Sequence, residues 1–286
     1  MILVTWNVQW CRGVDGRVDP ARIVDAARGL ADFDLLCLQE VADNYPDPRL
    51  AGADDADQFA RLAQLLPGYT AVPAIAVDQP GDGGRRRRFG NMILSRFPVR
   101  QVYRHLLPYP CDPGMPGMPR SALEAVVATP LGDLRVVTTH LEYYSAMQRM
   151  AQVEALRRIY ADGHAHARDA RITMDDGGPF QTFLRPRATL VAGDCNFEPD
   201  SGEYLRMLAG FDDATPPLFD AWRQLHRGLP HPTTFKLHEK TVPGEPELHC
   251  DFVFVSDELR ARLRDVRVDL GTEASDHQPI VVTLAS

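Results

Sequence analysis

Six apolar segments of this chain carry polar side chains at or beside one end. These polar residues are Asn7, Gln39 and Glu40, His140, Asp194 and Asn196, Asp251, and Asp276 with His277. One such residue is explained equally well by a cap, and Asp194 with Asn196 could by themselves form a turn that satisfies backbone donors. Burial of a charge without a partner costs several kcal/mol, however, so six such placements indicate one convergent site.

The residue types in this set restrict its chemistry. Four carboxylates (Glu40, Asp194, Asp251, Asp276) and two amides (Asn7, Asn196) are hard oxygen ligands, which suit Mg²⁺ or Mn²⁺ better than zinc. The two histidines can move protons or donate hydrogen bonds to a phosphoryl oxygen. No Ser-His-Asp motif, P-loop or GxGxxG sequence is present. The pattern therefore predicts metal-assisted attack of water on a phosphoester.

Short strands must position these residues, and the hydrophobic pattern predicts many of them. We expect strands at 2–6, 35–39, 69–77, 91–95, 122–129, 134–141, 188–193, 250–256, 266–270 and 279–284. Helical spacing occurs at 20–30, 56–66 and 145–163, where Met147, Val153 and Leu156 are expected to face the core. Many strands with few helices predict two stacked sheets with helices outside, as one domain over residues 1–286.

Gly- and Pro-rich segments are predicted to be long loops at 42–57, 79–90, 107–120 and 163–187. One of them contains the dense basic run Arg85–Arg88. This run is either a solvated loop or a clamp, including Arg88, on a substrate phosphate.

Composition excludes several classes of protein. The net charge of −8 argues against a surface that coats polyanions in general, although an acidic metal site contributes to that charge. No apolar run reaches the roughly 18 residues of a membrane span, and no leader pattern is present, so we expect a cytoplasmic protein. Five cysteines without CxxC spacing support neither a disulfide framework nor a zinc knuckle. Cys37, Cys195 and Cys250 are interpreted as inert buried thiols.

Seven short motifs together resemble the endonuclease/exonuclease/phosphatase superfamily. In chain order they are TWNVQW, LQE, GNMILSRFPV, TTHL, GDCNFEP, DFVF and SDHQPIVV, spanning residues 2 to about 283. Each motif is weak alone, but seven in the family's order are specific. The resemblance implies an α/β fold, a four-layer sandwich of two mixed β-sheets flanked by helices.

The resemblance also implies roles for individual residues. Glu40 resembles the principal metal ligand, Asn7 a second contributor to the metal or to the scissile phosphate, and Asp276 the second acidic residue near the metal. Asp194 resembles the residue that orients or deprotonates the attacking water, and Asn196 the residue that holds this water or a phosphate oxygen. Asp251 and His277 resemble the family's Asp–His pair, His140 a donor to the phosphate, and Asn91 a substrate-side turn residue, which a simple turn would also explain. Arg120 is a plausible phosphate contact or an ordinary surface arginine.

Two departures bear on the substrate. Abasic-site nucleases of the family carry Asn-x-Asp in the first motif, whereas this chain has Asn7-Val-Gln9, and it lacks extensive basic loops.

Our first hypothesis is a Mg²⁺-dependent nuclease acting on DNA or RNA. The second is a phosphatase or sphingomyelinase-like hydrolase acting on a small or lipid phosphoester. The third, a binding protein without catalysis, is disfavoured because every expected metal and proton-transfer position is filled.

Overall fold

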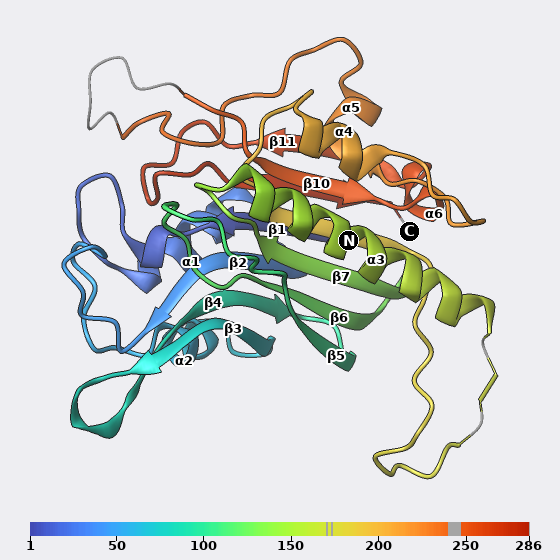
Figure 1. Ribbon diagram of the computed structural model, residues 1–286, viewed down its shortest axis with the longest axis horizontal. Helices are drawn as coiled ribbons and strands as arrows, with labels where there is room; N and C mark the ends of the chain where they lie inside the picture. Colours follow the sequence, from blue (N-terminus) through green and yellow to red (C-terminus); the bar gives the residue numbers. More distant parts are fainter. Residues whose placement is uncertain (170, 173, 240–246, 286) are drawn as a thin grey trace.

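Two β-sheets packed face to face form the centre of the molecule, seen in the computed structural model (Figure 1). The structure describes residues 1–169, 171–172, 174–239 and 247–285. Within these residues each sheet has six strands. The first sheet runs in the order β11 (Leu263–Val268), β12 (Ile280–Leu284), β1 (Ile2–Asn7), β2 (Leu35–Asp43), β4 (Arg86–Ser95) and β3 (Thr70–Pro80). The second runs β5 (Val99–Leu106), β6 (Ser121–Thr129), β7 (Gly132–His140), β8 (Thr189–Asp194), β10 (Asp251–Val255) and β9 (Phe219–Asp220).

Helices cover the outer face of each sheet. They are α1 (Pro20–Leu30), α2 (Gln58–Leu65), α3 (Ala146–Arg168), α4 (Gly202–Leu208), α5 (Ala221–Leu225) and α6 (Asp257–Arg260), with short 3₁₀ turns η1 (Gln9–Cys11) and η2 (Asp82–Gly84). Capping residues set where the helices begin: the Asp19 side chain accepts from the first turn of α1, and Ser145 accepts from Gln148 N at the start of α3. The predicted four-layer α/β sandwich is confirmed.

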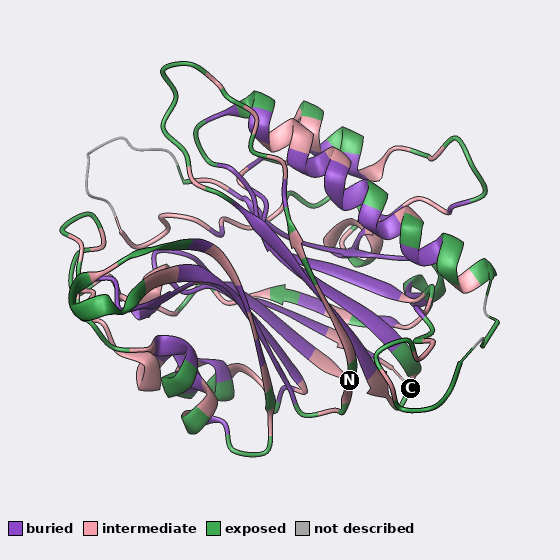
Figure 2. Ribbon diagram, turned by 60° about the horizontal axis from the view of Figure 1, so that its bottom comes forward, coloured by how far each residue is buried: buried purple, intermediate pink, exposed green. Residues whose placement is uncertain are grey.

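Three apolar clusters separate the layers. One lies between the sheets, one holds α1 and α2 against the first sheet, and one holds α3 and α4 against the second. Figure 2 shows α3 with buried residues on the face toward the sheet and exposed residues outside. Val153 and Leu156 are buried there as predicted, but Met147 is 45% exposed. The cluster shared by both sheets supports our proposal of one domain over residues 1–286.

Both sheets are mixed, and their parallel pairs position the site. In the first sheet β1 and β2 are parallel, and in the second β7 and β8 are parallel, while the other pairs are antiparallel. The carboxyl ends of parallel strands lie at the same edge of a sheet, so polar residues at those ends are brought together.

The structure corrects three expectations about the elements. Residues 86–90 belong to β4, so the predicted loop at 79–90 is a hairpin whose turn lies near η2. Helix α3 continues to Arg168, into the predicted loop at 163–187. The edge strand β5 was missed because its sequence, VRQVYRHL, alternates with exposed polar residues and is only half buried.

No helix among the described residues combines the length and the apolar character needed to cross a membrane.

Candidate active site

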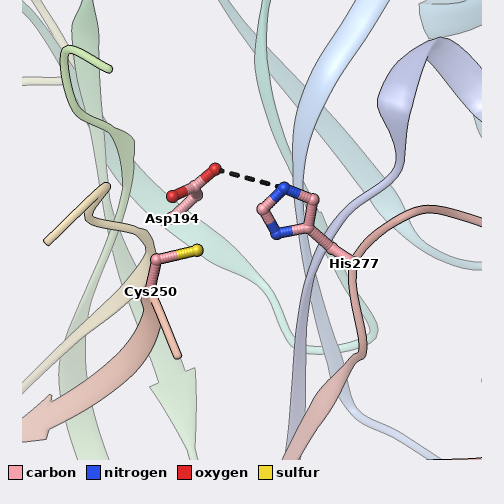
Figure 3. Close-up of side chains that lie close together, drawn as sticks. All are labelled: Asp194, Cys250 and His277. Atoms are coloured by element: carbon pink, nitrogen blue, oxygen red, sulfur yellow. Dashed lines mark ion pairs between the residues drawn. The ribbon is translucent and has the colours of Figure 1, made fainter. Parts of the chain in front are cut away.

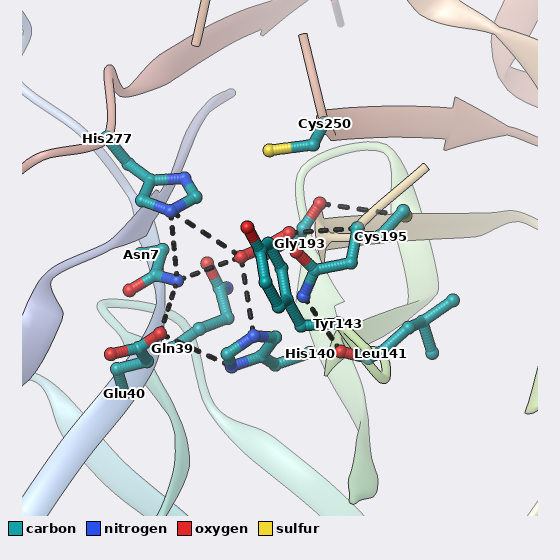
Figure 4. Close-up of polar contacts among 12 residues, drawn as sticks. Asn7, Gln39, Glu40, His140, Leu141, Tyr143, Gly193, Cys195, Cys250 and His277 are labelled. Carbon is teal, nitrogen blue, oxygen red and sulfur yellow. Dashed lines mark hydrogen bonds and ion pairs between the residues drawn. The ribbon is translucent and has the colours of Figure 1, made fainter. Parts of the chain in front are cut away.

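The polar residues predicted from the sequence meet at the carboxyl ends of the two parallel strand pairs (Figure 4). Asn7, the last residue of β1, lies beside Gln39 of β2 where the pairing of these strands ends, and His140 lies beside Asp194 at the ends of β7 and β8. Gly193 allows strands β7 and β8 to lie close together, because a Cβ at this position would lie only 2.0 Å from Thr139 O.

A β-bulge directs Glu40 into this site. The pairing of β2 with β4 passes from Leu38–Met92 to Val41–Gly90, so two residues of β2 stand opposite Asn91. Glu40 adopts a positive φ of 60° in the bulge. A non-glycine residue in this conformation costs about 1–3 kcal/mol, and such strain concentrates at functional sites.

Asn7 links the carboxylates of the two sheets. Its Nδ2 donates to Asp194 Oδ2 at 2.9 Å and to Glu40 Oε1 at 3.0 Å, while its Oδ1 accepts from Gln9 N at 3.1 Å. The opposite amide orientation would place an oxygen against two carboxylates, so the network determines this one. The Asn7 oxygen is therefore turned away from the carboxylates. In this arrangement Asn7 is a donor that holds Glu40 and Asp194, and its contribution to a metal site stays a prediction.

Asp251 and His277 form the pair that the motif order implied. His277 Nδ1 lies 2.8 Å from Asp251 Oδ2, and His277 Nε2 lies 3.7 Å from Asp194 Oδ2. Burial alone would lower the pKa of His277, but Asp251 and Asp194 outweigh burial and hold this pKa well above its usual value. The two carboxylates thus favour the protonated imidazole, which can donate to an anionic substrate.

The other histidine is electrically neutral. His140 Nε2 lies 3.4 Å from Asp194 Oδ2, and its Nδ1 lies 3.9 Å from Glu40 Oε1. Burial, followed by the positive charge of Arg120, lowers the pKa of His140 to about 3. The site thus holds one charged and one neutral imidazole beside the same carboxylate.

Two carboxylates and a histidine lie where a divalent cation would fit, and Asp276 lines the same hollow. Burial and the charge of Asp276 raise the pKa of Glu40 to about 7. Burial raises the pKa of Asp276 to about 6, against the lowering effect of His277. Glu40, His140 and Asp194 offer ligand atoms that lie within 4.8 Å of one another. Oxygen-rich donors with excess negative charge suit a cation such as Mg²⁺ or Mn²⁺, so the residues fit the metal implied by the motifs.

Asn196 completes the predicted catalytic set at the end of β8. Its backbone N donates to Asp194 Oδ1 at 3.0 Å, and its Nδ2 donates to Leu141 O at 2.9 Å. Its φ is 50°, a second strained position in the site. Asp194 is thus held from both sides, by Asn7 and by Asn196.

The three expected substrate contacts have different outcomes. Arg120 lines the catalytic hollow, donates to Glu142 Oε2 at 3.3 Å, and has a buried Nη1 without a partner. Asn91 is buried and donates to Ser121 O at 2.9 Å. Arg88 lies in β4, ion-paired with Asp43 and Asp57, and is not among the residues that line the catalytic hollow. Of the three, only Arg120 has the geometry of a phosphate contact.

The wider basic run is neutralised by acidic neighbours. Arg85 pairs with Asp43 and Asp55, Arg86 with Asp78, and Arg87 with Asp82. The geometry therefore gives no support to a phosphate clamp formed by Arg85–Arg88.

Comparison with known proteins identifies the family. The sequence model of the Endonuclease/Exonuclease/phosphatase family matches residues 4–277. The chain belongs to this family. No curated protein sequence matches it.

Solved structures of the family share the fold. A crystal structure of an endonuclease/exonuclease/phosphatase from Beutenbergia cavernae is 26% identical, with a TM-score of 0.70, over 100% of this chain and 72% of that one. D. rerio TDP2, complexed with a single-strand DNA product, is 20% identical with a TM-score of 0.66, over 100% and 99% of the two chains. The 3′ phosphatase NExo from Neisseria, bound to a product DNA hairpin, is 22% identical with a TM-score of 0.61, over 100% of both chains. Members of this family are phosphoester hydrolases.

Aromatic residues that sequence reasoning missed surround the polar residues of the candidate site. They line a hollow of about 310 Å³ and are Trp10, Phe89, Tyr143, Tyr144 and Phe235. Most of them lie in loops, where no hydrophobic period marks a functional residue.

Gln9 was recognised only as a departure from the Asn-x-Asp motif, yet it donates to Asp276 Oδ2 at 2.8 Å. Its amide stands where a carboxylate would repel Asp276.

Two further hollows adjoin the catalytic one. One of about 430 Å³ shares Phe89, Arg120 and Tyr144 with it. The other, also about 430 Å³, shares Asn196 and Phe235. The three hollows thus adjoin one another around the polar residues of the site.

Proposed function

We propose that this chain is a Mg²⁺- or Mn²⁺-dependent phosphodiesterase that cleaves nucleic acid. The observation that carries the proposal is the set of groups around Asp194: the Asn7 side chain and the Asn196 backbone N hold its carboxylate, and His277 and His140 flank it. This arrangement supplies both a group for an attacking water and donors for a phosphoryl oxygen.

Each side chain has a role that follows from its position. Asp194, fixed by two amides, orients the attacking water and accepts its proton. His277, protonated and aligned by Asp251, donates to a phosphoryl oxygen as negative charge builds there. His140 and the unpaired Nη1 of Arg120 supply further donors on the same hollow.

Glu40 and Asp276 would hold the divalent cation, with Asn7 keeping Glu40 in place. When bound there, the cation supplies Lewis-acid polarisation of the phosphoester and stabilises the leaving oxygen.

The arrangement of the three hollows favours a polymeric substrate. Hollows on both sides of the catalytic residues leave room for an extended chain, and their exposed aromatic residues, including Tyr143 and Tyr144, offer surfaces on which bases stack. The bound nucleic acids of TDP2 and NExo support the same substrate class.

A small or lipid phosphoester is the second candidate, favoured by a different observation. The basic run Arg85–Arg88 is ion-paired with aspartates, and the chain carries a net charge of −8. The protein therefore lacks the long basic surface with which many polynucleotide-binding proteins contact phosphates.

A split substrate panel separates the candidates. Turnover with Mg²⁺ or Mn²⁺ is measured on plasmid DNA, single-stranded DNA and RNA, and on bis-p-nitrophenyl phosphate, inositol phosphates and sphingomyelin. We expect polynucleotide cleavage that is lost in Asp194→Ala and kept in Glu154→Gln, which removes an exposed acid paired with Arg206. Activity confined to the small substrates would establish the second candidate. Equal turnover by Asp194→Ala and the wild-type protein would refute both.

A further inference from the structure

A second cluster of possible metal ligands lies beside the hydrolytic residues. Asp194, Cys250 and His277 each offer one ligand atom, and these atoms lie within 4.8 Å of one another. All three residues are buried. Figure 3 shows the Cys250 sulfur directed toward the space between the Asp194 carboxylate and the His277 ring.

The backbone around Cys250 holds this thiol in position. Cys250 N donates to Thr234 Oγ1 at 3.1 Å, and Cys250 O accepts from Cys195 N at 2.8 Å. Cys250 also lines the hollow that contains Phe197 and Phe235, so an ion can reach it from that side. Burial, followed by the charges of Asp194 and Asp251, raises the pKa of the thiol well above its usual value. Without a metal the group is a neutral thiol and a poor nucleophile.

We propose that Asp194, Cys250 and His277 bind zinc, and that this ion inhibits the enzyme. Sulfur, imidazole nitrogen and carboxylate oxygen are the donors that zinc prefers, with a water as the fourth ligand, whereas Mg²⁺ avoids sulfur. Asp251 contacts Nδ1 of His277, so that Nε2 faces the cluster. A carboxylate on the other ring nitrogen orients histidine ligands in zinc sites in the same way. Binding forms Zn–S, Zn–N and Zn–O bonds and releases the protons of the thiol and of Nε2 to solvent, with no change in oxidation state.

Zinc in this cluster would engage two residues that hydrolysis needs. Asp194 could no longer orient water, and His277 could no longer donate to a phosphoryl oxygen. Inhibition rests on the proposed function, but zinc binding does not, so the two are tested by separate readouts.

The binding test uses Co²⁺ as a spectroscopic substitute for zinc. A thiolate bound to Co²⁺ gives a charge-transfer absorption band, and titration with Zn²⁺ abolishes it by displacement. We expect the band in the wild-type protein, in Cys195→Ser and in Glu40→Gln, but not in Cys250→Ser or Cys250→Ala. Cys195 is the matched control because it is an adjacent buried cysteine outside the cluster. Glu40→Gln removes the carboxylate of the proposed Mg²⁺ site and leaves the zinc cluster intact.

Calorimetry with Zn²⁺ gives the affinity. Loss of one of the three protein ligands is expected to weaken binding on the order of 10²-fold. A Zn²⁺ affinity in folded Cys250→Ser equal to that of wild type would overturn the proposal, as would absence of the charge-transfer band in wild type. Where turnover is present, inhibition by Zn²⁺ should be weaker in Cys250→Ser than in Cys195→Ser; equal inhibition in the two variants would overturn the inhibitory role.

Discussion

Glu124→Gln tests how the second sheet is held behind the site. Glu124 is fully buried and faces two arginines and a histidine: Arg135 Nε at 2.8 Å, Arg185 Nη2 at 2.8 Å and His105 Nε2 at 3.1 Å. Arg135 also donates to Ile159 O at 2.8 Å, which fastens helix α3 to the strand that ends at His140. The substitution keeps the shape of the side chain and removes the charge that compensates two buried arginines.

The magnitude follows from the pKa of Glu124. Burial acts to raise this pKa, but His105 and the two arginines outweigh burial and lower it from 4.5 to about 2. A shift of this size corresponds to about 3 kcal/mol in the free energy of unfolding, similar to the cost of breaking a buried ion pair. Because the folded-state pKa is the lower one, the stabilisation is complete above about pH 4.5 and is lost as the pH falls toward 2.

Urea unfolding followed by circular dichroism measures this effect. At pH 7 we expect Glu124→Gln to be about 3 kcal/mol less stable than the wild-type protein, with the difference shrinking below about pH 4.5. The control is Glu154→Gln, whose exposed ion pair with Arg206 is worth under about 1 kcal/mol. A loss no larger in Glu124→Gln than in the control, or one that does not depend on pH, would refute the reasoning.

Four further predictions concern the site and its support. Asp251→Asn should lower kcat on the order of 10²–10⁴ with little change in KM, because His277 loses its charged partner; unchanged kcat on any cleaved substrate would contradict this. Arg120→Ala should raise KM about tenfold or more, whereas Arg88→Ala should leave KM near wild type, and steady-state kinetics that reversed this order would restore the phosphate clamp. Gly163→Ala should destabilise the fold by about 1–3 kcal/mol in urea unfolding, since its Cβ would lie 1.7 Å from the buried Arg135 Nη1; wild-type stability would show that Arg135 can move aside. Removal of divalent cations with EDTA should abolish turnover and addition of Mg²⁺ or Mn²⁺ should restore it; full activity in EDTA would exclude the role given to Glu40.

Regular, strongly apolar elements could be predicted from the sequence, and irregular ones could not. Helix α1 was predicted at its observed bounds because its apolar positions follow the helical period, and the structure shows that Asp19 caps its first turn. The edge strand β5 was missed because exposed polar residues interrupt a strand that is only partly buried. The arginines of β4 were assigned to a loop because four consecutive charged residues show no alternation of apolar and polar positions. Their pairing with β3 is what shows that they belong to a strand.

The sequence by itself determined the residue types of the site and their attachment to strand ends. Apolar strands must be buried, so a carboxylate at the end of such a strand, such as Asp194, is carried toward the centre of the fold. That local logic was enough to predict the set Glu40, His140, Asp194, Asp251 and His277 and the class of chemistry.

Only the tertiary structure decided how those side chains are oriented and which of their neighbours matter. The orientation of the Asn7 amide depends on two carboxylates from different sheets, and the neutralisation of Arg88 depends on Asp43 and Asp57. The thiol of Cys250 became a possible ligand only when β10 was placed against β8 and His277 was brought across from the other sheet. These are contacts between residues far apart in the chain, and a local pattern carries no information about their distance or direction.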